Sequence, residues 1–186
     1  MANGRVIGFS GGVSRPSKTR LLVETAVNEV SARLDIGSSI YEIEDFGASL
    51  GLARRAEDLE PRGRAVLREI LDADVLVVGT PTYKGSYSGL FKHVFDLIDP
   101  LALTGKPVIL TATGGSERHA LIVEHQLRPL FGFFAAHSAP TGIFAVDRDF
   151  DGGRLISEQA LTRIRQSVSE IEHLASKPSV RLLAAE

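Results

Sequence analysis

Short runs of β-branched and aliphatic residues alternate with longer amphipathic runs along the chain, and this alternation restricts the fold more than any other feature. Buried strands are predicted over residues 5–9, 39–43, 74–79, 107–112 and 141–146. Helical spacing of apolar residues predicts helices over about 17–34, from Pro61 onward, and over about 88–98, 120–134 and 157–174. Residues 45–60 show little periodicity and predict a loop with a helical turn. Strands that alternate with helices in this way form a parallel sheet covered by helices on both faces.

The run from Asp74 to Gly79 is almost continuously apolar, which is typical of a central parallel strand. Right-handed crossovers leave few topologies for five such strands. The loop after the first strand does not read G-x-G-x-x-G, which argues against a Rossmann dinucleotide fold. We therefore expect a flavodoxin-like α/β fold, with a five-stranded parallel sheet in the order 2-1-3-4-5. One domain is expected over residues 1–176, followed by a C-terminal tail over 177–186.

Composition excludes several classes of protein. The 186 residues, of which 44% are hydrophobic, suffice for one well-packed core. A net charge of −2 argues against a nucleic-acid-binding protein and weakly against a strongly acidic electron carrier. Cysteine is absent and the histidines lack ligand spacing, so no metal site is expected. The apolar run from Val6 to Phe9 is too short for a signal sequence, and no run approaches a membrane span, so a cytoplasmic protein is expected.

Three loops follow the carboxyl ends of the first, third and fourth predicted strands. They cover residues 10–19, 80–87 and 111–116, and all are rich in glycine and hydroxyl side chains. In an open parallel sheet, ligands bind beyond these strand ends, near the point where the strand order reverses. We therefore expect the three loops to line one binding site.

The first loop carries hydroxyls, two cations and the amides of a helix start, a combination that binds a phosphate monoester. The candidate residues are Ser10, Arg15, Ser17, Lys18 and Thr19. An ordinary Gly/Ser turn with Ser17 as helix cap is the alternative. The loop is not a Walker A motif, because G-x-x-x-x-G-K-[ST] is absent.

The second and third loops have the features expected around a planar ring. Tyr83 offers an aromatic face, and backbone amides after Pro81 suit the ring carbonyls. The candidate residues are Pro81, Thr82, Tyr83, Lys84, Gly85 and Ser86 in the second loop, and Thr113, Gly114 and Gly115 in the third. Plain βα turns are the alternative for both loops. No G-x-S-x-G motif is present, so hydrolase chemistry is not expected.

Together the loops resemble those of the NAD(P)H-dependent FMN reductase family. The second reads Pro81-Thr82-Tyr83-Lys84-Gly85-Ser86-Tyr87-Ser88-Gly89 and is similar to the family's Pro-x-Tyr-x-x-Ser-Tyr-x-Gly. The first resembles a Ser-x-Arg-x-x-Ser phosphate clamp, although it is about one residue longer, and the third resembles a Thr-Gly-Gly turn. The resemblance covers residues 6–146. Residues 81–89 and 111–129 are most similar to the reductases of two-component sulfonate monooxygenases.

This resemblance implies cofactors, partners and an activity. FMN would bind with its phosphate in the first loop and its ring over residues 81–86, and NADH or NADPH would stack on the open face of the ring. No protein residue is expected to act as a catalytic acid or base. Reduced FMN would pass to a partner monooxygenase that desulfonates alkanesulfonates or methanesulfonate. The alternatives are an FMN-bound quinone or azo reductase, a flavodoxin-type electron carrier, and a flavin-free regulatory domain.

Two features of the predicted helix over 120–134 go beyond a plain core helix. His125 stands where the sulfonate-type reductases resemble one another in having an extra residue, and an inserted residue produces a π-bulge. A surface histidine in a regular helix is the alternative. The apolar residues Leu127, Leu130, Phe131, Phe133 and Phe134 exceed the needs of one small core, and the family resemblance implies that such a helix joins copies into a homodimer or homotetramer.

Overall fold

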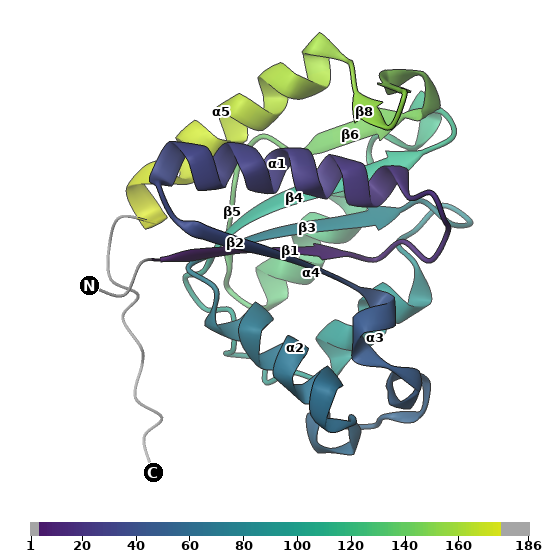
Figure 1. Cartoon of the computed structure of the whole chain (residues 1–186), viewed down its shortest axis with the longest axis vertical. Coiled ribbons are helices and arrows are strands. Elements are labelled where there is room, and N and C mark those ends of the chain that lie inside the picture. Colours follow the sequence, from purple (N-terminus) through teal and green to yellow (C-terminus); the bar gives the residue numbers. More distant parts are fainter. Residues whose placement is uncertain (1–3, 176–186) are drawn as a thin grey trace.

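Parallel strands form the centre of the molecule in the computed structural model, which describes residues 4–175 (Figure 1). The strands are β1 (Arg5–Ser10), β2 (Gly37–Glu42), β3 (Val75–Pro81), β4 (Pro107–Gly114), β5 (His137–Ser138) and β6 (Ile143–Val146). Their order is β2-β1-β3-β4-β5, with β6 also paired to β4, and all these pairings are parallel. The predicted flavodoxin-like order 2-1-3-4-5 is confirmed. The predicted tail over 177–186 lies outside the described residues.

The fifth position of the sheet is occupied by two short strands instead of the single strand predicted over 141–146. β5 and β6 both pair with β4, and residues 139–142 separate them. Pro140 has no amide to donate to a neighbouring strand. The Thr141 amide donates to the carboxylate of Glu170 at 2.8 Å instead of to β4. The edge of the sheet is therefore interrupted, although the strand direction is kept.

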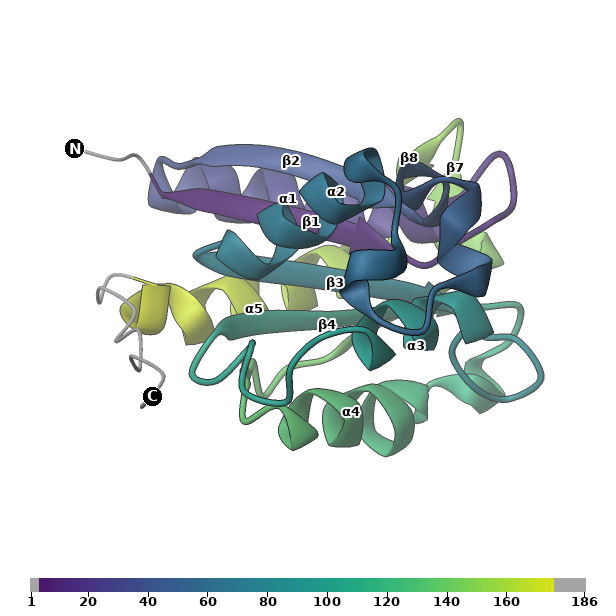
Figure 2. The same cartoon turned by 90° about the horizontal axis from the view of Figure 1, so that it is seen from below.

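Helices cover both faces of the sheet, as predicted (Figures 1 and 2). On one face lie α1 (Lys18–Leu34) and α5 (Glu158–Ala175). On the other lie α2 (Pro61–Asp72), α3 (Gly89–Asp96) and α4 (Arg128–Phe133). The predicted loop over 45–60 contains 3₁₀ turns at Ile43–Phe46, Ala48–Leu52 and Ala56–Asp58. Within residues 4–175, none of the helices has the length and apolar character needed to span a bilayer.

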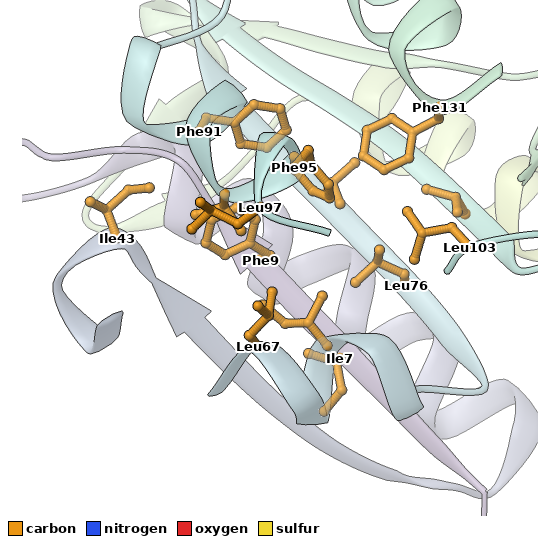
Figure 3. Close-up of a cluster of buried hydrophobic side chains, with 14 of the residues drawn as sticks. Ile7, Phe9, Ile43, Leu67, Leu76, Phe91, Phe95, Leu97, Leu103 and Phe131 are labelled. Carbon is orange, nitrogen blue, oxygen red and sulfur yellow. The ribbon is translucent and has the colours of Figure 1, made fainter. Parts of the chain in front are cut away.

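A separate apolar core fills each side of the sheet. Under α2, α3 and α4, the rings of Phe9 and Phe91 stack with centroids 5.6 Å apart, and Phe95 packs edge-on against Phe131 (Figure 3). Aliphatic side chains fill the other side, under α1 and α5. Because both faces are buried, β1, β3 and β4 are nearly continuous apolar runs.

The helix predicted over 120–134 is not regular. A 3₁₀ turn at Glu117–His119 precedes it, and it contains a π-helical turn at Val123–Leu127 followed by α4. His125 lies within the π turn, so of the two alternatives that the sequence left open at this residue, the structure has the bulge. The apolar spacing correctly indicated the buried face of this segment at Leu127, Phe131 and Phe134. Phe133 lies off that face and is 69% exposed.

The polar turn predicted over 147–153 is also more structured than expected. It contains a 3₁₀ turn at Asp147–Asp149, and β7 (Phe150–Asp151) then pairs antiparallel with β8 (Arg154–Leu155). Gly152 and Gly153 form the tip of this hairpin with positive φ angles of 52° and 76°. The segment that follows β6 is therefore a short turn and hairpin, not an irregular loop.

Candidate functional site

A cavity of about 280 Å³ is lined by loops that leave the carboxyl ends of the strands, and these ends point to the right in Figure 1. Nine of the predicted site residues line it: Ser17, Lys18, Thr19, Pro81, Thr82, Tyr83, Thr113, Gly114 and Gly115. The structure thus brings the three loops together around one hollow. The predicted residues Ser10, Arg15, Lys84, Gly85 and Ser86 are not among those that line it.

Six further residues line the cavity that sequence reasoning did not select. They are Gly12, Ser14, Pro16, Val146, Asp147 and Phe150. Val146 is the last residue of β6, and Asp147 and Phe150 follow that strand, whose carboxyl end lies on the same side as those of β1, β3 and β4. Ligands bind beyond the carboxyl ends of parallel strands, and this rule, which selected the three loops, also applies to the loop after the fifth strand. Residues 147–153 of that loop were interpreted from the sequence as a solvated turn.

The first loop is anchored between β3 and α3. The Gly11 amide donates to the carbonyl of Gly79 at 2.7 Å, and Ser88 Oγ donates to the carbonyl of Gly11 at 2.9 Å. A Cβ on Gly11 would lie 2.7 Å from the ring of Phe91, so the close approach requires glycine. Ser10 is fully buried, and its Oγ lies 3.5 Å from the amide of Gly12. Ser10 therefore belongs to the support of the loop.

The start of α1 provides hydrogen-bond donors at the cavity. Ser17 caps the helix, as predicted, since its Oγ accepts from the Arg20 amide at 3.1 Å. The first-turn amides of Lys18 and Thr19 precede the first intrahelical bond, and partial positive charge gathers there. A Cβ on Gly12 would lie 2.7 Å from Ser17 Oγ, so glycine keeps this wall open. The chemistry of these donors fits a phosphate group.

A buried hydrogen bond ties the helix start to the third loop. Thr19 Oγ1 and Thr113 Oγ1 lie 2.7 Å apart, and both side chains are almost fully buried. The Thr113 carbonyl in turn accepts from the amide and from the hydroxyl of Thr82, at 2.7 and 2.8 Å. Through Thr113, the first and second loops are therefore held at fixed positions on opposite sides of the cavity.

Arg15 is directed toward the end of β2. Its guanidinium donates to Glu42 at 2.7 Å and to Glu44 at 2.8 Å. Arg20 donates to the other oxygen of Glu42 at 3.3 Å. The hydrogen bonds that Arg15 donates to Glu42 and Glu44 raise the pKa of its guanidinium above the ordinary value. Contact between Arg15 and a phosphate remains a prediction, because Arg15 is outside the cavity lining.

The second loop forms a tight turn with Tyr83 at the cavity wall. Tyr83 and Ser86 exchange backbone hydrogen bonds at 2.8 and 3.1 Å around Lys84 and Gly85, whose φ angles are 52° and 87°. Two positive φ angles are typical of a type I′ turn. Ser86 Oγ donates to the side chain of Gln126 at 3.1 Å. The turn is therefore linked to the π-helical segment.

Opposite charges meet at the side of the cavity formed by β6. Lys18 Nζ lies 2.9 Å from a carboxylate oxygen of Asp147. Beyond Asp147 lies a second hollow of about 480 Å³, lined by Gly115, Ser116, Glu117, Arg118, Val146, Asp147 and Arg148. It shares Gly115, Val146 and Asp147 with the first cavity, so the two hollows adjoin each other.

The sheet order and the position of the cavity define a flavodoxin-like α/β protein with a site suited to a phosphorylated ligand. Residues 5–151 match the sequence profile of the family described as NADPH-dependent FMN reductase. The chain belongs to this family, as its loops predicted. It is accordingly an oxidoreductase, an NAD(P)H-dependent FMN reductase.

Curated relatives agree with this assignment. The chain is 48% identical over 161 residues to FMN reductase (NADPH) of Pseudomonas aeruginosa, a match that covers 87% of each chain. It is 47% identical over 161 residues to NADH-dependent FMN reductase SfnF of Pseudomonas fluorescens, covering 87% of this chain and 86% of the relative. Both nicotinamide nucleotides thus occur among similar proteins.

Solved structures agree as well. An oxidoreductase from Corynebacterium diphtheriae superposes with a TM-score of 0.83 at 34% identity, covering 96% of this chain and all of the other. The apo form of the NADH:FMN oxidoreductase EmoB has a TM-score of 0.75 at 30% identity, covering 96% and 94%. The similarity therefore extends over nearly the whole chain.

Proposed function

We propose that this enzyme takes FMN as an exchanging substrate and supplies reduced FMN to a separate monooxygenase, which desulfonates alkanesulfonates or methanesulfonate. The supporting observation is the open position of the cavity, whose wall residue Tyr83 is 40% exposed. A mononucleotide can enter and leave such a site. The sulfonate substrate is supported by the similarity of residues 81–89 and 111–129 to reductases of sulfonate monooxygenases. A cytoplasmic location suits an enzyme that draws on NADH or NADPH.

In this proposal the first loop binds the FMN phosphate. The amides of Lys18 and Thr19, the hydroxyl of Ser17 and the ammonium of Lys18 are the donors. The second loop, Pro81 to Ser86, and the third loop, Thr113 to Gly115, would hold the ring. When bound, FMN supplies the acceptor for a hydride from NADH or NADPH. The protein orients the two reactants, and backbone donors stabilise negative charge on the reduced ring.

The test is the oxidation of NADH and of NADPH at 340 nm with increasing free FMN. We expect a rate that rises and saturates with FMN, and sulfite release when an alkanesulfonate monooxygenase and its substrate are added. Omission of FMN should abolish both signals. A protein that carries stoichiometric FMN and turns over only with added quinone would instead be a quinone or azo reductase. An absence of oxidation with either nucleotide would indicate an electron carrier or a regulatory domain.

We also propose that the enzyme is a homodimer or homotetramer. The support comes from exposed apolar side chains on one segment, where Phe133 is 69% and Leu121 is 59% exposed. Single exposed apolar residues are common, but two large ones on the same segment, twelve residues apart, favour a contact between copies. Gel filtration with light scattering at micromolar concentration measures the assembly directly. A clean monomer would contradict this proposal and would leave the proposed reaction intact.

A further inference from the structure

We propose that Asp147 is a positioning residue that holds Lys18 in an ion pair which the FMN phosphate has to displace, so that Asp147 weakens FMN binding and speeds its release. This inference rests on the proposed function, in which FMN exchanges during turnover. It concerns a residue outside the three loops that carry the family resemblance. It also assigns a role to the wall of the cavity that β6 contributes.

The geometry places the two residues on facing walls. Lys18 is the first residue of α1, directly after the capping residue Ser17. Asp147 directly follows β6 and begins a 3₁₀ turn. Both residues line the cavity, and Lys18 Nζ lies 2.9 Å from Asp147 Oδ1. The cation nearest the helix start is therefore held by a carboxylate at the place where a phosphate would bind.

Other charged side chains near the cavity are paired elsewhere and do not line it. Among the described residues that line the cavity, Lys18 and Asp147 are the ones that carry charge. Arg15 and Arg20 donate to Glu42 at the end of β2. On the side of Asp147, Arg148 pairs with Glu117. Lys18 and Asp147 are thus the local charges that a phosphate in the cavity meets first.

The other two carboxylates of this acidic segment, Asp149 and Asp151, do not face the cavity in the way that Asp147 does. Asp149 accepts a hydrogen bond from the Val146 amide at 2.7 Å and so caps the turn. Asp151 lies in β7, is exposed, and is outside the lining of either hollow. Asp147 is therefore the carboxylate of this segment that faces both hollows.

The ion pair is suited to exchange. The side chains of Lys18 and Asp147 are 43% and 69% exposed, and pairs this exposed contribute little to the stability of a fold. A phosphate that carries nearly two negative charges competes well for the ammonium and is repelled by the carboxylate. At the high effective dielectric of such a surface, this repulsion corresponds to roughly a three- to tenfold weaker affinity. An enzyme that hands its flavin to a partner gains faster release from this arrangement.

The test compares FMN with riboflavin, which has the same ring and no phosphate. Binding to the wild-type protein and to Asp147→Asn is measured by quenching of flavin fluorescence. We expect Asp147→Asn to bind FMN about three- to tenfold more tightly and to bind riboflavin unchanged. Stopped-flow dilution should show slower FMN dissociation from the variant. The difference between the two proteins should shrink as salt is added, because screening weakens the repulsion.

Two further variants serve as controls. Asp151→Asn removes the same charge from the β7–β8 hairpin outside the cavity, and it should leave the FMN affinity unchanged. In a Lys18→Gln background, Asp147→Asn should gain less affinity for FMN, because the competed ammonium is gone.

Unchanged FMN affinity in Asp147→Asn, equal tightening for riboflavin, or weaker FMN binding would each overturn the proposal. These readouts are equilibrium and dissociation measurements. They are separate from the FMN saturation of NAD(P)H oxidation by the wild-type enzyme, which tests the proposed function itself.

Discussion

The guanidinium of Arg15 lies 2.7 Å from the carboxylate of Glu42, a residue that is only 6% exposed. The parallel pairing of β1 with β2 places Ser10 opposite Glu42, so the carboxylate sits beside the start of the first loop. Arg15 in turn comes from the middle of that loop. The contact therefore connects the loop to the sheet, and it draws the arginine away from the cavity.

Glu42→Gln should weaken FMN binding by loosening the first loop. Arg15 and Arg20 donate to different oxygens of Glu42, and a glutamine amide keeps only one acceptor oxygen, so one guanidinium bond is lost and the other loses the carboxylate charge. We expect the KM for FMN to rise several-fold with a smaller change in kcat. Glu44→Gln is the matched control, since Glu44 is 61% exposed and bonds Arg15 alone, and its effect should be smaller. Equal KM values for wild type and Glu42→Gln would contradict this role.

Arg15→Gln distinguishes a loop anchor from a phosphate ligand. If Arg15 acts through Glu42, then Arg15→Gln and Glu42→Gln should have similar effects, and the double variant should be no worse than either. FMN and riboflavin should be affected alike. A large loss of affinity for FMN alone, seen only in Arg15→Gln, would instead support the phosphate contact predicted from the Ser-x-Arg-x-x-Ser resemblance. Fluorescence titration with both flavins measures the difference.

Replacement of one hydroxyl in the Thr19–Thr113 pair should destabilise the fold. The two Oγ1 atoms lie 2.7 Å apart in a buried position, so Thr113→Val leaves the hydroxyl of Thr19 without this partner. An unsatisfied buried hydroxyl costs about 1–3 kcal/mol. The double variant Thr19→Val with Thr113→Val should recover part of the loss, because neither hydroxyl is then left behind. Urea unfolding of the four proteins measures the coupling, and strictly additive losses would contradict it.

The sheet was predictable where burial makes the pattern simple. The strands β1, β3 and β4 are buried on both faces, and their apolar runs therefore located them within two residues of their observed ends. The fifth strand was placed less well, because Pro140 and the bond from Thr141 to Glu170 interrupt its pairing. No local pattern reports a bond to a helix that begins 17 residues later in the chain.

The site was predictable only to the level of its loops. The apolar spacing of Leu127, Phe131 and Phe134 fits a regular helix, so it could not locate the π turn, and the resemblance gave a bulge at His125 only as one of two alternatives. The side chain of Arg15 points toward Glu42, and these two residues are neighbours only because β1 pairs with β2, which no local sequence pattern shows. Asp147 was missed because an acidic turn has the same composition whether it faces solvent or a cavity.

Gly79→Ala should destabilise the protein at the centre of the sheet. A Cβ at Gly79 would lie 2.4 Å from a methyl of Val23 and 2.7 Å from Thr111 Oγ1, so α1 would have to shift. Overpacking of this kind costs about 1–3 kcal/mol. Gly132→Ala is the matched control in α4, where nothing lies within 4 Å of the added Cβ. It should stabilise by about 0.5–1 kcal/mol through helix propensity. Thermal and urea unfolding compare the two, and a stable Gly79→Ala would refute the close packing.

Acid should weaken the link between α5 and the start of β6. Burial raises the pKa of Glu170, but the hydrogen bonds from the side chain and amide of Thr141, together with Gln166 and Arg163, outweigh it, so the pKa lies below its ordinary value of 4.5. A carboxylate whose pKa falls on folding stabilises the folded state above its unfolded pKa, and this contribution is lost as the pH falls through the folded pKa. The stability of wild type should therefore exceed that of Glu170→Gln at neutral pH, and the gap should close below about pH 4.5. Urea unfolding of both proteins from pH 7 to pH 3 measures the gap, and a constant difference over this range would show that the charge of Glu170 has no part in it.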